Sequence, residues 1–537
     1  MNNNKENETI ELTGQDLTFE QIYDISHEGA KVCITEGAMQ RLALSHKLLL
    51  QGAVEGKEIY GVTRGVGLNK DKVLFEGDAL TPETLAASEK FNKNVLRSHS
   101  CGVGEGVDEE IVRALMTIRL NTSLRGFSAL HPSIALGYKD FLNHGIHPVV
   151  PERGTVGEAD ITNNGHIGLV MMGEHFADYN GERISGEDAL KRANLSPLKP
   201  YAKDALSIVN TNAFGASQAV LMALDVKKFL DTADIIFALS LEGFNGNVAP
   251  FMSEPASLRP FKGFEKQAER LRKLTKNSYL WEVYEGRALQ DPLSFRDYFP
   301  NMAATRNCLE SLLETLMVQI NHADDNPAVI PGVKLDESEP SQKRKYQVYK
   351  DESLYGMIVP TSGLRAIAWV LPMEQLAIAL SHISKSSCLR TTKLSTVFFT
   401  GLSRFLTPKD DSLGYTTIQK PFASLDAEIR HLSNPSSADL LPLAGDIEDI
   451  GTNSTYVIKK LRAILDNLYH ILGIELLHAA QAVDLRMRDE SSGVYLGDIT
   501  KKFHGEFRKE VPFLSEDRVQ TYDIKKSHDF LINYQPE

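Results

Sequence analysis

Four segments of the sequence carry side chains that could move a proton or bind a carboxylate. EIYGVTRGVG places Tyr60 just before glycines that allow a tight turn, so its phenol could project into a cavity from a loop. QDPLSFR contains Arg296, whose planar guanidinium matches a carboxylate, and HADDNPAV contains Asn326 thirty residues later. SIVNTNAFGAS adds Asn210 in an apolar context, where a buried amide needs hydrogen-bond partners. Each residue alone also has a structural interpretation, as a turn tyrosine, a surface ion pair or a core amide.

The composition is that of a soluble globular protein, with 537 residues of which 42% are hydrophobic and 24% charged. The 58 basic and 71 acidic residues give a net charge of −13, which argues against nucleic-acid or anionic-membrane partners. The opening MNNNKENETI lacks the apolar core of a signal peptide, and no run of eighteen apolar residues follows, so we expect a cytoplasmic protein. The four cysteines lack the paired spacing of a zinc or redox site, and the sequence predicts no metal ion.

Helical periodicity dominates the chain from Asp204 onward. In IKKLRAILDNLYHILGIELLHAAQAVDLR, one stripe of a helix is formed by Ile458, Leu461, Leu465, Leu468 and Leu472. Apolar residues also occupy other faces of this segment, so such a helix must be buried on several sides, within a large bundle or between subunits. We therefore expect an oligomer.

Strand-like runs are few and short, around EIYGVTRGV and HPVVPERG, and lie beside glycine-rich turns. The expected fold is mainly α, a long helical bundle with a small mixed α/β N-terminal region. Its expected parts are a mixed region over residues 1–204, a central helical bundle over 205–495 and a C-terminal extension over 496–537. The charged, proline-containing residues 332–350 indicate an exposed loop.

Taken together and in order, YGVTRGVG, SHSCGVGE, RGFSAL, VNTNA, QDPLSFR, DDNPAV and IELLHAAQAVDLR resemble segments of the histidine and aromatic amino acid ammonia-lyase family. The resemblance runs from about Leu17 to Arg486. It implies a mostly α-helical homotetramer whose active sites are each assembled from several subunits. It also implies that Tyr60 is the general base that removes a β-proton, that Arg296 and Asn326 hold the substrate carboxylate, and that Asn210 lies beside the reactive centre.

The segment GTVGEADITNNGHIG, residues 154–168, departs from that family. Family members carry Ala-Ser-Gly after the position of Gly157, and this tripeptide cyclises into methylidene-imidazolone, an electrophile that captures the substrate amine and makes it leave. The segment here contains no serine and is one residue short when aligned through Asp160 and His166. We therefore expect no such prosthetic group and no other cofactor. Leu293 in QDPLSFR stands where these lyases usually carry tyrosine, which also argues against ordinary deamination.

Three further residues indicate what the pocket accepts. His99 in SHSCG and Glu428 in LDAEIRHLSNP resemble the histidine-specific members, where such residues line the pocket for an imidazole. Lys393 in LRTTKLSTVFF aligns where histidine lyases carry a methionine beside the substrate ring. A cation there would bring new chemistry, although Lys393 could equally be a solvated lysine.

A quaternary ammonium group removes the need for the missing electrophile. Trimethylammonium departs as a neutral amine, and it has no lone pair with which to attack an electrophile. Glu158 or Asp160, near the altered position, could offer negative charge to that cation, and an aromatic face could assist. A histidine betaine fits both observations, and the resemblance points to the branch of the family that cleaves ergothioneine without methylidene-imidazolone.

The mechanism that this resemblance implies is an anti elimination. Tyr60 as phenolate removes a β-proton, Arg296 fixes the carboxylate, and trimethylamine leaves to give thiourocanate. Lys393 could donate to the sulfur or a ring nitrogen as negative charge develops, while Glu428 orients the other ring N–H. Tyr60 needs a depressed pKa for this role, which a nearby cation would favour.

Two alternatives remain open at this point. One is a non-catalytic relative that keeps the tetrameric fold and binds an amino-acid-like ligand, which the loss of the electrophile and of the tyrosine at Leu293 would fit. The other is a lyase, also lacking the electrophile, for a different histidine-like amino acid. Retention of Tyr60, Arg296, Asn210 and Asn326 speaks against the first, and the imidazole-type residues favour histidine-like substrates without proving them.

Overall fold

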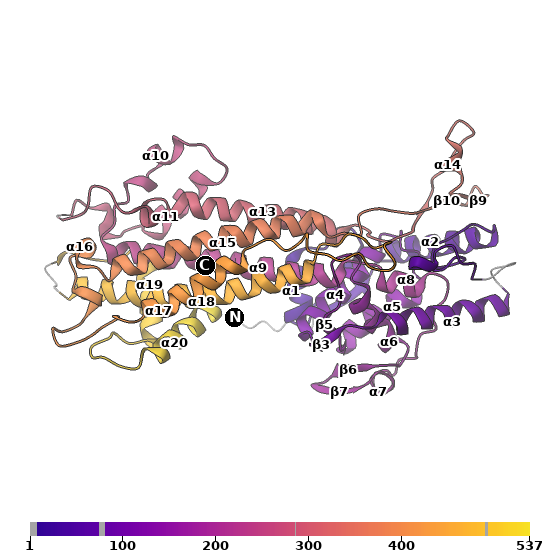
Figure 1. Cartoon of the computed structure of the whole chain (residues 1–537), viewed down its shortest axis with the longest axis horizontal. Helices are drawn as coiled ribbons and strands as arrows, with labels where there is room; N and C mark the ends of the chain where they lie inside the picture. Colours follow the sequence, from indigo (N-terminus) through magenta and orange to yellow (C-terminus); the bar gives the residue numbers. More distant parts are fainter. Residues whose placement is uncertain (1–7, 75–80, 285, 489–491, 537) are drawn as a thin grey trace. The chain divides into compact units, whose positions relative to one another are not determined.

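Long helices dominate the protein, as the sequence predicts. The computed structural model describes residues 8–74, 81–284, 286–488 and 492–536 (Figure 1). The chain forms two compact units, and both are discontinuous in sequence. Unit 1 comprises Met1–Leu221, Leu313–Val370 and Ser436–Ile458, and unit 2 comprises Met222–Leu312, Leu371–Pro435 and Lys459–Glu537.

The two units do not follow the three contiguous segments expected from the sequence. Among the described residues, four long helices begin in one unit and end in the other: α9 (Ala213–Phe244), α13 (Tyr298–Asn321), α15 (Ile367–Leu394) and α18 (Ser454–Met487). Because hydrophobic periodicity continues through such helices, it gives no signal at the points where the chain changes unit.

Unit 1 is the mixed α/β part. Its helices are α1 (Phe19–His27), α2 (Glu36–Val54), α3 (Pro82–His99), α4 (Glu109–Ser123), α5 (Pro132–His144), α6 (Ile161–Met171), α7 (Gly186–Arg192), α8 (Asp204–Val209) and α14 (Ser341–Arg344), with the 3₁₀ turn η1 (Gly67–Asn69). Its strands are β1 (Thr9–Leu12), β2 (Lys31–Ile34), β3 (Val103–Gly106), β4 (Ile146–Pro148), β5 (Pro151–Arg153), β6 (Phe176–Tyr179), β7 (Glu182–Ser185), β8 (Ala328–Pro331), β9 (Gln347–Asp351) and β10 (Leu354–Val359).

The strands of unit 1 form four small sheets. β1 and β2 pair in parallel, whereas β3 pairs with β5, β4 with β6 and β7, and β8 with β10 and β9 in antiparallel ladders. Strand β10 packs on α2 around a buried apolar cluster that includes Leu48, Leu49, Ile59, Val329, Val348 and Ile358. The cluster also includes Val62, so apolar residues on both sides of Tyr60 are buried in it.

Local sequence signals explain where several helices begin and end. Thr18 and Gln21 form a capping box at α1, and the hydroxyl of Thr35 accepts from the N–H of Ala38 at the start of α2. Helix α5 ends at Gly145, which adopts the left-handed conformation (φ +67°) that glycine tolerates best.

Of the two segments predicted to be strand-like, one forms strands and the other does not. The segment predicted to be an exposed loop contains regular elements. HPVVPERG forms β4 and β5, which confirms that prediction. EIYGVTRGV forms no strand but a turn in which the N–H groups of residues 62–64 donate to the carbonyl of Ile59. Gly61 decides this, because its φ of +71° is one that a strand does not accommodate. The residues expected as an exposed loop, 332–350, contain α14 and most of β9.

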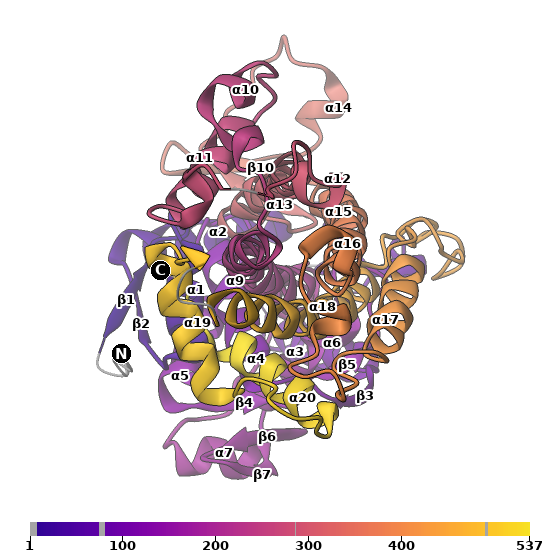
Figure 2. The ribbon, with the colours of Figure 1, turned by 90° about the vertical axis from the view of Figure 1, so that its left-hand side faces the viewer.

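Unit 2 is helical. Besides its parts of the four long helices, it contains α10 (Ser253–Ser257), α11 (Phe264–Leu274), α12 (Leu293–Arg296), α16 (Val397–Thr400), α17 (Gln419–Leu432), α19 (Asp498–Glu510) and α20 (Gln520–Asn533). It also contains the 3₁₀ turns η2 (Ala249–Phe251), η3 (Tyr279–Trp281) and η4 (Arg404–Leu406). Helices α9, α13, α15 and α18 run alongside one another, and Figure 2 views them nearly end-on.

Helix α18 is buried on several faces, as its sequence predicts. Its stripe residues Ile458, Leu461 and Leu468 have no exposed surface, and neither does Ile464 on a neighbouring face. An ion pair crosses the core of unit 2, because Arg390 of α15 donates two hydrogen bonds, of 2.7 and 2.8 Å, to Glu475 of α18. Within the described ranges, α15 is the one helix long and apolar enough to cross a membrane, and 56% of its most apolar stretch is buried in protein, as in a core helix.

Candidate active site

Unit 1 contains a cavity of about 860 Å³ whose wall comes from seven segments far apart in the sequence. These are the turn after α2, the end of α3, residues 158–161, the end of α8, the segment that contains Asn326, residues 362–367 and residues 444–450. Of the residues predicted from the sequence, the cavity wall includes Tyr60, His99, Glu158, Asn210 and Asn326. The fold therefore brings residues that are distant in the chain together around one cavity.

Tyr60 lies half-buried in the turn after α2, and its phenol oxygen accepts a 2.8 Å hydrogen bond from the N–H of Gly67. The turn depends on glycine, because a Cβ on Gly65 would lie 2.3 Å from the carbonyl oxygen of Asn69. Burial raises the pKa of Tyr60 above its ordinary value, the Gly67 hydrogen bond opposes this shift, and the charge of Glu448 adds to it. The pKa thus moves opposite to the direction that a phenolate base needs, mainly because the phenol is buried and also because the nearby charge is a carboxylate.

The segment that departs from the ammonia-lyases is held in place by main-chain hydrogen bonds. The carbonyl of Gly157 accepts from the Thr452 hydroxyl at 2.8 Å and from the Ala366 N–H at 3.2 Å. The N–H of Ala159 donates to Oδ1 of Asn212 at 3.1 Å. A Cβ on Gly157 would lie 2.1 Å from the Thr452 hydroxyl oxygen, so this close approach requires glycine. An ordinary, tightly fixed peptide segment therefore occupies this part of the wall.

Asp160 lies behind the wall and does not line the cavity. It is fully buried, with one carboxylate oxygen accepting from the N–H of Gly215 and the other from the hydroxyl of Thr155, each at 2.7 Å. Burial raises its pKa to about 6, against the effect of these two hydrogen bonds. Of the two carboxylates that the sequence offers for a cation, only Glu158 faces the cavity. Asp160 instead fixes residues 155–160 to the start of α9.

Glu158 is the carboxylate at the cavity, and its main chain pairs with Arg365 in an isolated antiparallel bridge. Within the described part of the chain, its Oε1 atom is buried without a hydrogen-bond partner. Burial raises the pKa of Glu158 to about 7; Glu448 and Asp449 raise it further, and Arg365 opposes them. Three carboxylates and one guanidinium thus line this cavity, an arrangement that favours a bound cation.

Asn210 and Asn326 meet at the cavity, where the Nδ2 group of Asn210 donates to the main-chain carbonyl of Asn326 at 3.0 Å. The Oδ1 atom of Asn326 accepts from the N–H of Thr361 at 3.0 Å. Beneath them, Asp325 forms a fully buried ion pair with Arg119, whose Nη2 lies 2.8 Å from Oδ1. The DDNPAV segment therefore positions its amide through a buried charge pair that the sequence alone did not reveal.

His99 is the last residue of α3 and lines the same cavity. Its Nδ1 atom lies 2.8 Å from the carbonyl of Val95. A proton on Nδ1 satisfies this contact and leaves Nε2 as a hydrogen-bond acceptor, which suits a ligand that carries an N–H group.

Arg296, Lys393 and Glu428 belong to unit 2, on α12, α15 and α17. Arg296 donates to Gln290 at 2.7 Å, and Leu293 beside it is 58% exposed. Burial lowers the pKa of Lys393, whose Nζ lies 3.4 Å from the carbonyl of Leu389. Glu428 is exposed. These three residues are therefore not among those that unit 1 gathers at its cavity.

Three charged residues of the cavity wall were missed by the sequence analysis: Arg365, Glu448 and Asp449. The acidic run GDIED at 445–449 and the SGLRA segment at 362–366 contain them, but neither follows a motif that indicates a site. Two isolated antiparallel bridges, Leu443 with Glu448 and Glu158 with Arg365, help to bring these side chains to the cavity.

The fold and the cavity define the class of the protein. The model of the aromatic amino acid lyase family matches residues 17–509, so the chain belongs to this family and is a carbon–nitrogen lyase of the ammonia-lyase type. This finding confirms the family resemblance and the mainly α fold expected from the sequence.

Three individual proteins are similar to this chain in sequence or in structure. The crystal structure of the ergothioneine-degrading enzyme ergothionase from Treponema denticola, in complex with desmethyl-ergothioneine sulfonic acid, shares 37% sequence identity with a TM-score of 0.88, over 98% of each chain. Histidine ammonia-lyase 2 of Fusobacterium nucleatum is 31% identical over 534 residues, 98% of each chain. Histidine ammonia-lyase from Trypanosoma cruzi superposes with a TM-score of 0.82 at 23% identity, over 97% of this chain and 93% of that one, and so shares the fold.

Proposed function

We propose that this lyase eliminates trimethylamine from ergothioneine to give thiourocanate, without a methylidene-imidazolone group. One observation carries the proposal: Tyr60 shares a cavity with the carboxylates of Glu158 and Glu448, and residues 154–168 of its wall contain no serine. A primary amine needs an electrophile in order to leave, whereas a quaternary ammonium needs only a site that accepts its charge.

The carboxylates of the cavity wall favour a substrate that carries a positive charge. Burial and neighbouring carboxylates raise the pKa of Glu158 to about 7, so its anionic form is poorly stabilised by the protein alone. A trimethylammonium group has no N–H to donate, so it is recognised by charge and by contact with its methyl groups. Bound next to Glu158 and Glu448, it would relieve their mutual repulsion and keep Glu158 ionised.

The trimethylammonium group also supplies the positive charge that Tyr60 needs nearby in order to have a lower pKa. Burial and the Glu448 charge raise the pKa of Tyr60, and a trimethylammonium group close to the phenol would act in the opposite direction. The hydrogen bond from the N–H of Gly67 also stabilises the phenolate. The substrate thereby activates its own base, and a ligand without a permanent positive charge does so less well.

In the proposed step, the phenolate of Tyr60 takes the proton from the β-carbon. The electrons of that C–H bond form the C=C bond, and the electrons of the C–N bond leave with nitrogen as neutral trimethylamine. Arg296 and Asn326 hold the carboxylate and Asn210 borders the reacting carbons. Lys393, whose pKa is lowered by burial, donates a hydrogen bond toward the ring sulfur or nitrogen. Glu428 orients the other ring N–H, and His99 accepts a hydrogen bond from the ligand.

We propose that Arg296, Lys393 and Glu428 join the site through assembly of a cytoplasmic homotetramer, as the family resemblance implies. Light scattering that gives a tetramer supports this arrangement, and a monodisperse monomer at micromolar concentration would rule it out.

The ring specificity is the finer part of the proposal. Relatives named as histidine ammonia-lyases favour an imidazole-bearing substrate, and the absent serine argues against histidine itself. The 37% identity to an ergothioneine-degrading enzyme supports the sulfur-bearing betaine.

The experiment is a comparison of three substrates on one preparation. Purified protein is incubated with ergothioneine, histidine betaine and histidine, and the unsaturated product is followed by its near-ultraviolet absorbance. We expect ergothioneine to react fastest and histidine not to react. Deamination of histidine would overturn the proposal. Binding of ergothioneine that raises the melting temperature without turnover would instead favour a non-catalytic relative.

A further inference from the structure

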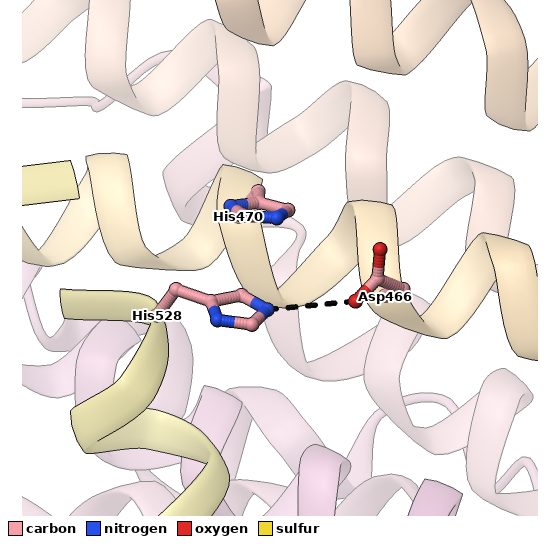
Figure 3. A group of neighbouring side chains, drawn as sticks. All are labelled: Asp466, His470 and His528. Atoms are coloured by element: carbon pink, nitrogen blue, oxygen red, sulfur yellow. Dashed lines mark ion pairs between the residues drawn. The ribbon is translucent and has the colours of Figure 1, made fainter. Parts of the chain in front are cut away.

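A cluster of three side chains in unit 2 lies outside the cavity described above. Asp466 and His470 come from α18, and His528 comes from α20 (Figure 3). One potential ligand atom from each residue lies within 4.8 Å of those of the other two. Both histidines are partly buried and Asp466 is exposed, so the cluster is accessible from solvent at its acidic end.

The spacing along α18 is that of a helical metal site. Asp466 and His470 are four residues apart, which puts both side chains on the same face of the helix, one turn from each other. His528 approaches this face from a second helix, so an ion held by all three residues would cross-link α20 to α18. Cysteine spacing could not reveal this cluster, because its ligands are histidine and aspartate and one of them is distant in sequence.

The ring nitrogens of His528 have different surroundings. Nδ1 lies 3.3 Å from the carboxylate of Asp529 and satisfies that contact when it carries the proton. Nε2 is buried, has no hydrogen-bond partner among the described residues, and lies 3.5 Å from Oδ1 of Asp466. In the neutral tautomer protonated on Nδ1, the Nε2 lone pair of His528 faces a lone pair of the Asp466 carboxylate across this distance of 3.5 Å. A carboxylate on one ring nitrogen with a metal ion on the other is a recurrent arrangement in metal sites.

Placing a proton on both histidines is an unfavourable way to compensate the facing lone pairs of His528 and Asp466. The rings of His470 and His528 are stacked, with centroids 4.0 Å apart and an angle of 16° between planes. Two imidazolium ions stacked in this way would repel each other. A cation shared by the cluster resolves the conflict without charging both rings.

We propose that Asp466, His470 and His528 bind a divalent transition metal ion of the Zn²⁺ type, which fastens α20 to α18. Two imidazole nitrogens and one carboxylate oxygen are a common zinc ligand set, with a fourth position left for water. Binding requires the His470 ring to turn out of its stack, so that its nitrogen and Nε2 of His528 both point at the ion. Asp529 then acts behind His528 by holding its Nδ1 proton.

The test measures metal binding by the tag-free full-length chain after chelator treatment. Isothermal titration with ZnCl₂ is expected to give one site per chain, and Zn²⁺ is expected to raise the melting temperature. Each of Asp466→Asn, His470→Gln and His528→Gln should weaken Zn²⁺ binding by about tenfold or more. Asp466→Asn is the safest of these variants, because its side chain is 63% exposed and its loss leaves no cavity.

His504→Gln serves as the matched control. His504 of α19 also pairs with an aspartate, Asp484, at 2.9 Å, but Arg508 occupies the same carboxylate at 2.7 Å, so a cation is disfavoured there. This variant should bind Zn²⁺ like the parent. Substitution of Co²⁺ should give a visible spectrum without a thiolate charge-transfer band, which excludes the cysteines as ligands.

The proposal is wrong if the stripped parent binds no Zn²⁺, or if all three variants bind it as tightly as the parent does. It is equally wrong if His504→Gln weakens binding as much as His528→Gln does. None of these results depends on lyase activity, so they leave the proposed reaction untouched.

Discussion

The side-chain amide of Asn210 donates a 3.0 Å hydrogen bond to the main-chain carbonyl of Asn326, which lies 116 residues further along the chain. The same two segments meet again where the N–H of Asn212 donates to Asp324 at 2.8 Å. Asp325 between them pairs with Arg119 inside the protein. The amides at the cavity therefore depend on two buried aspartates, Asp324 and Asp325, that do not belong to its wall.

Asp325→Asn is predicted to destabilise the protein by about 3 kcal/mol, because it leaves the buried guanidinium of Arg119 without its main counterion. Asp324, 3.6 Å from Arg119, compensates in part. Denaturant unfolding measures the change. Asp178→Asn is the matched control, since Asp178 also binds an arginine, Arg183, through two hydrogen bonds but at the surface; its loss should cost less than about 1 kcal/mol. Equal effects of the two substitutions would contradict the structural role of the buried pair.

Tyr60→Phe is predicted to lower kcat by about 10² to 10⁴-fold while the fold is kept, because it removes the base and little volume. Tyr349→Phe, which removes an exposed hydroxyl of the same unit, should leave kcat unchanged. Steady-state kinetics with ergothioneine measures both. Retention of near-parental turnover by the Tyr60 variant would remove this residue from the mechanism.

Glu158 is predicted to make KM depend on pH. Its pKa is about 7, and only its carboxylate form attracts the trimethylammonium group. The carboxylate fraction grows as pH rises through 7, so KM for ergothioneine should fall between about pH 6 and pH 8 and then level off. Glu158→Gln should raise KM and flatten this dependence.

The control for Glu158→Gln is Glu105→Gln on β3, an exposed residue away from the cavity wall, which should keep the parental profile. A Glu158→Gln variant with the parental KM and pH profile would show that another group recognises the cation.

Lys393→Met is predicted to lower kcat about a hundredfold, on the order of 3 kcal/mol, with a smaller effect on KM, because the lysine stabilises charge that grows in the transition state. Lys385→Met on the same helix is the control; Lys385 is 55% exposed and pairs at 3.4 Å with the buried carboxylate of Asp426, which keeps its hydrogen bond from Ser384. If the two variants behave alike, Lys393 is a solvated lysine and takes no part in the reaction.

Much of the fold follows from local sequence signals. The all-round apolar pattern of residues 458–486 predicts the buried α18, and threonine caps mark the start of α1 and α2. EIYGVTRGV carries both the strand signal of its β-branched and aromatic residues and the turn signal of its glycines, and the turn prevails because Gly61 takes a positive φ. The division into units could not be predicted, since it depends on long-range packing within helices that have one continuous period.

The site was predicted in part. Tyr60, His99, Asn210 and Asn326 do line one cavity, and their chemistry could be inferred from residue type and family resemblance. The sequence does not distinguish Glu158 from Asp160, because the two carboxylates are two positions apart and the backbone conformation decides that Glu158 faces the cavity while Asp160 is buried. The acidic residues near 448 reach the wall through tertiary contacts that no local motif announces.

Elimination of a quaternary amine without an electrophile is tested most directly by measuring trimethylamine release with a preparation whose mass has been established. Intact mass spectrometry first establishes whether the chain carries its unmodified sequence mass, and trimethylamine released from ergothioneine by that preparation is then quantified. We predict the unmodified mass together with equimolar trimethylamine and thiourocanate. A mass deficit of two waters in a peptide spanning Gly157, or release of ammonia from histidine in place of trimethylamine from ergothioneine, would contradict the account.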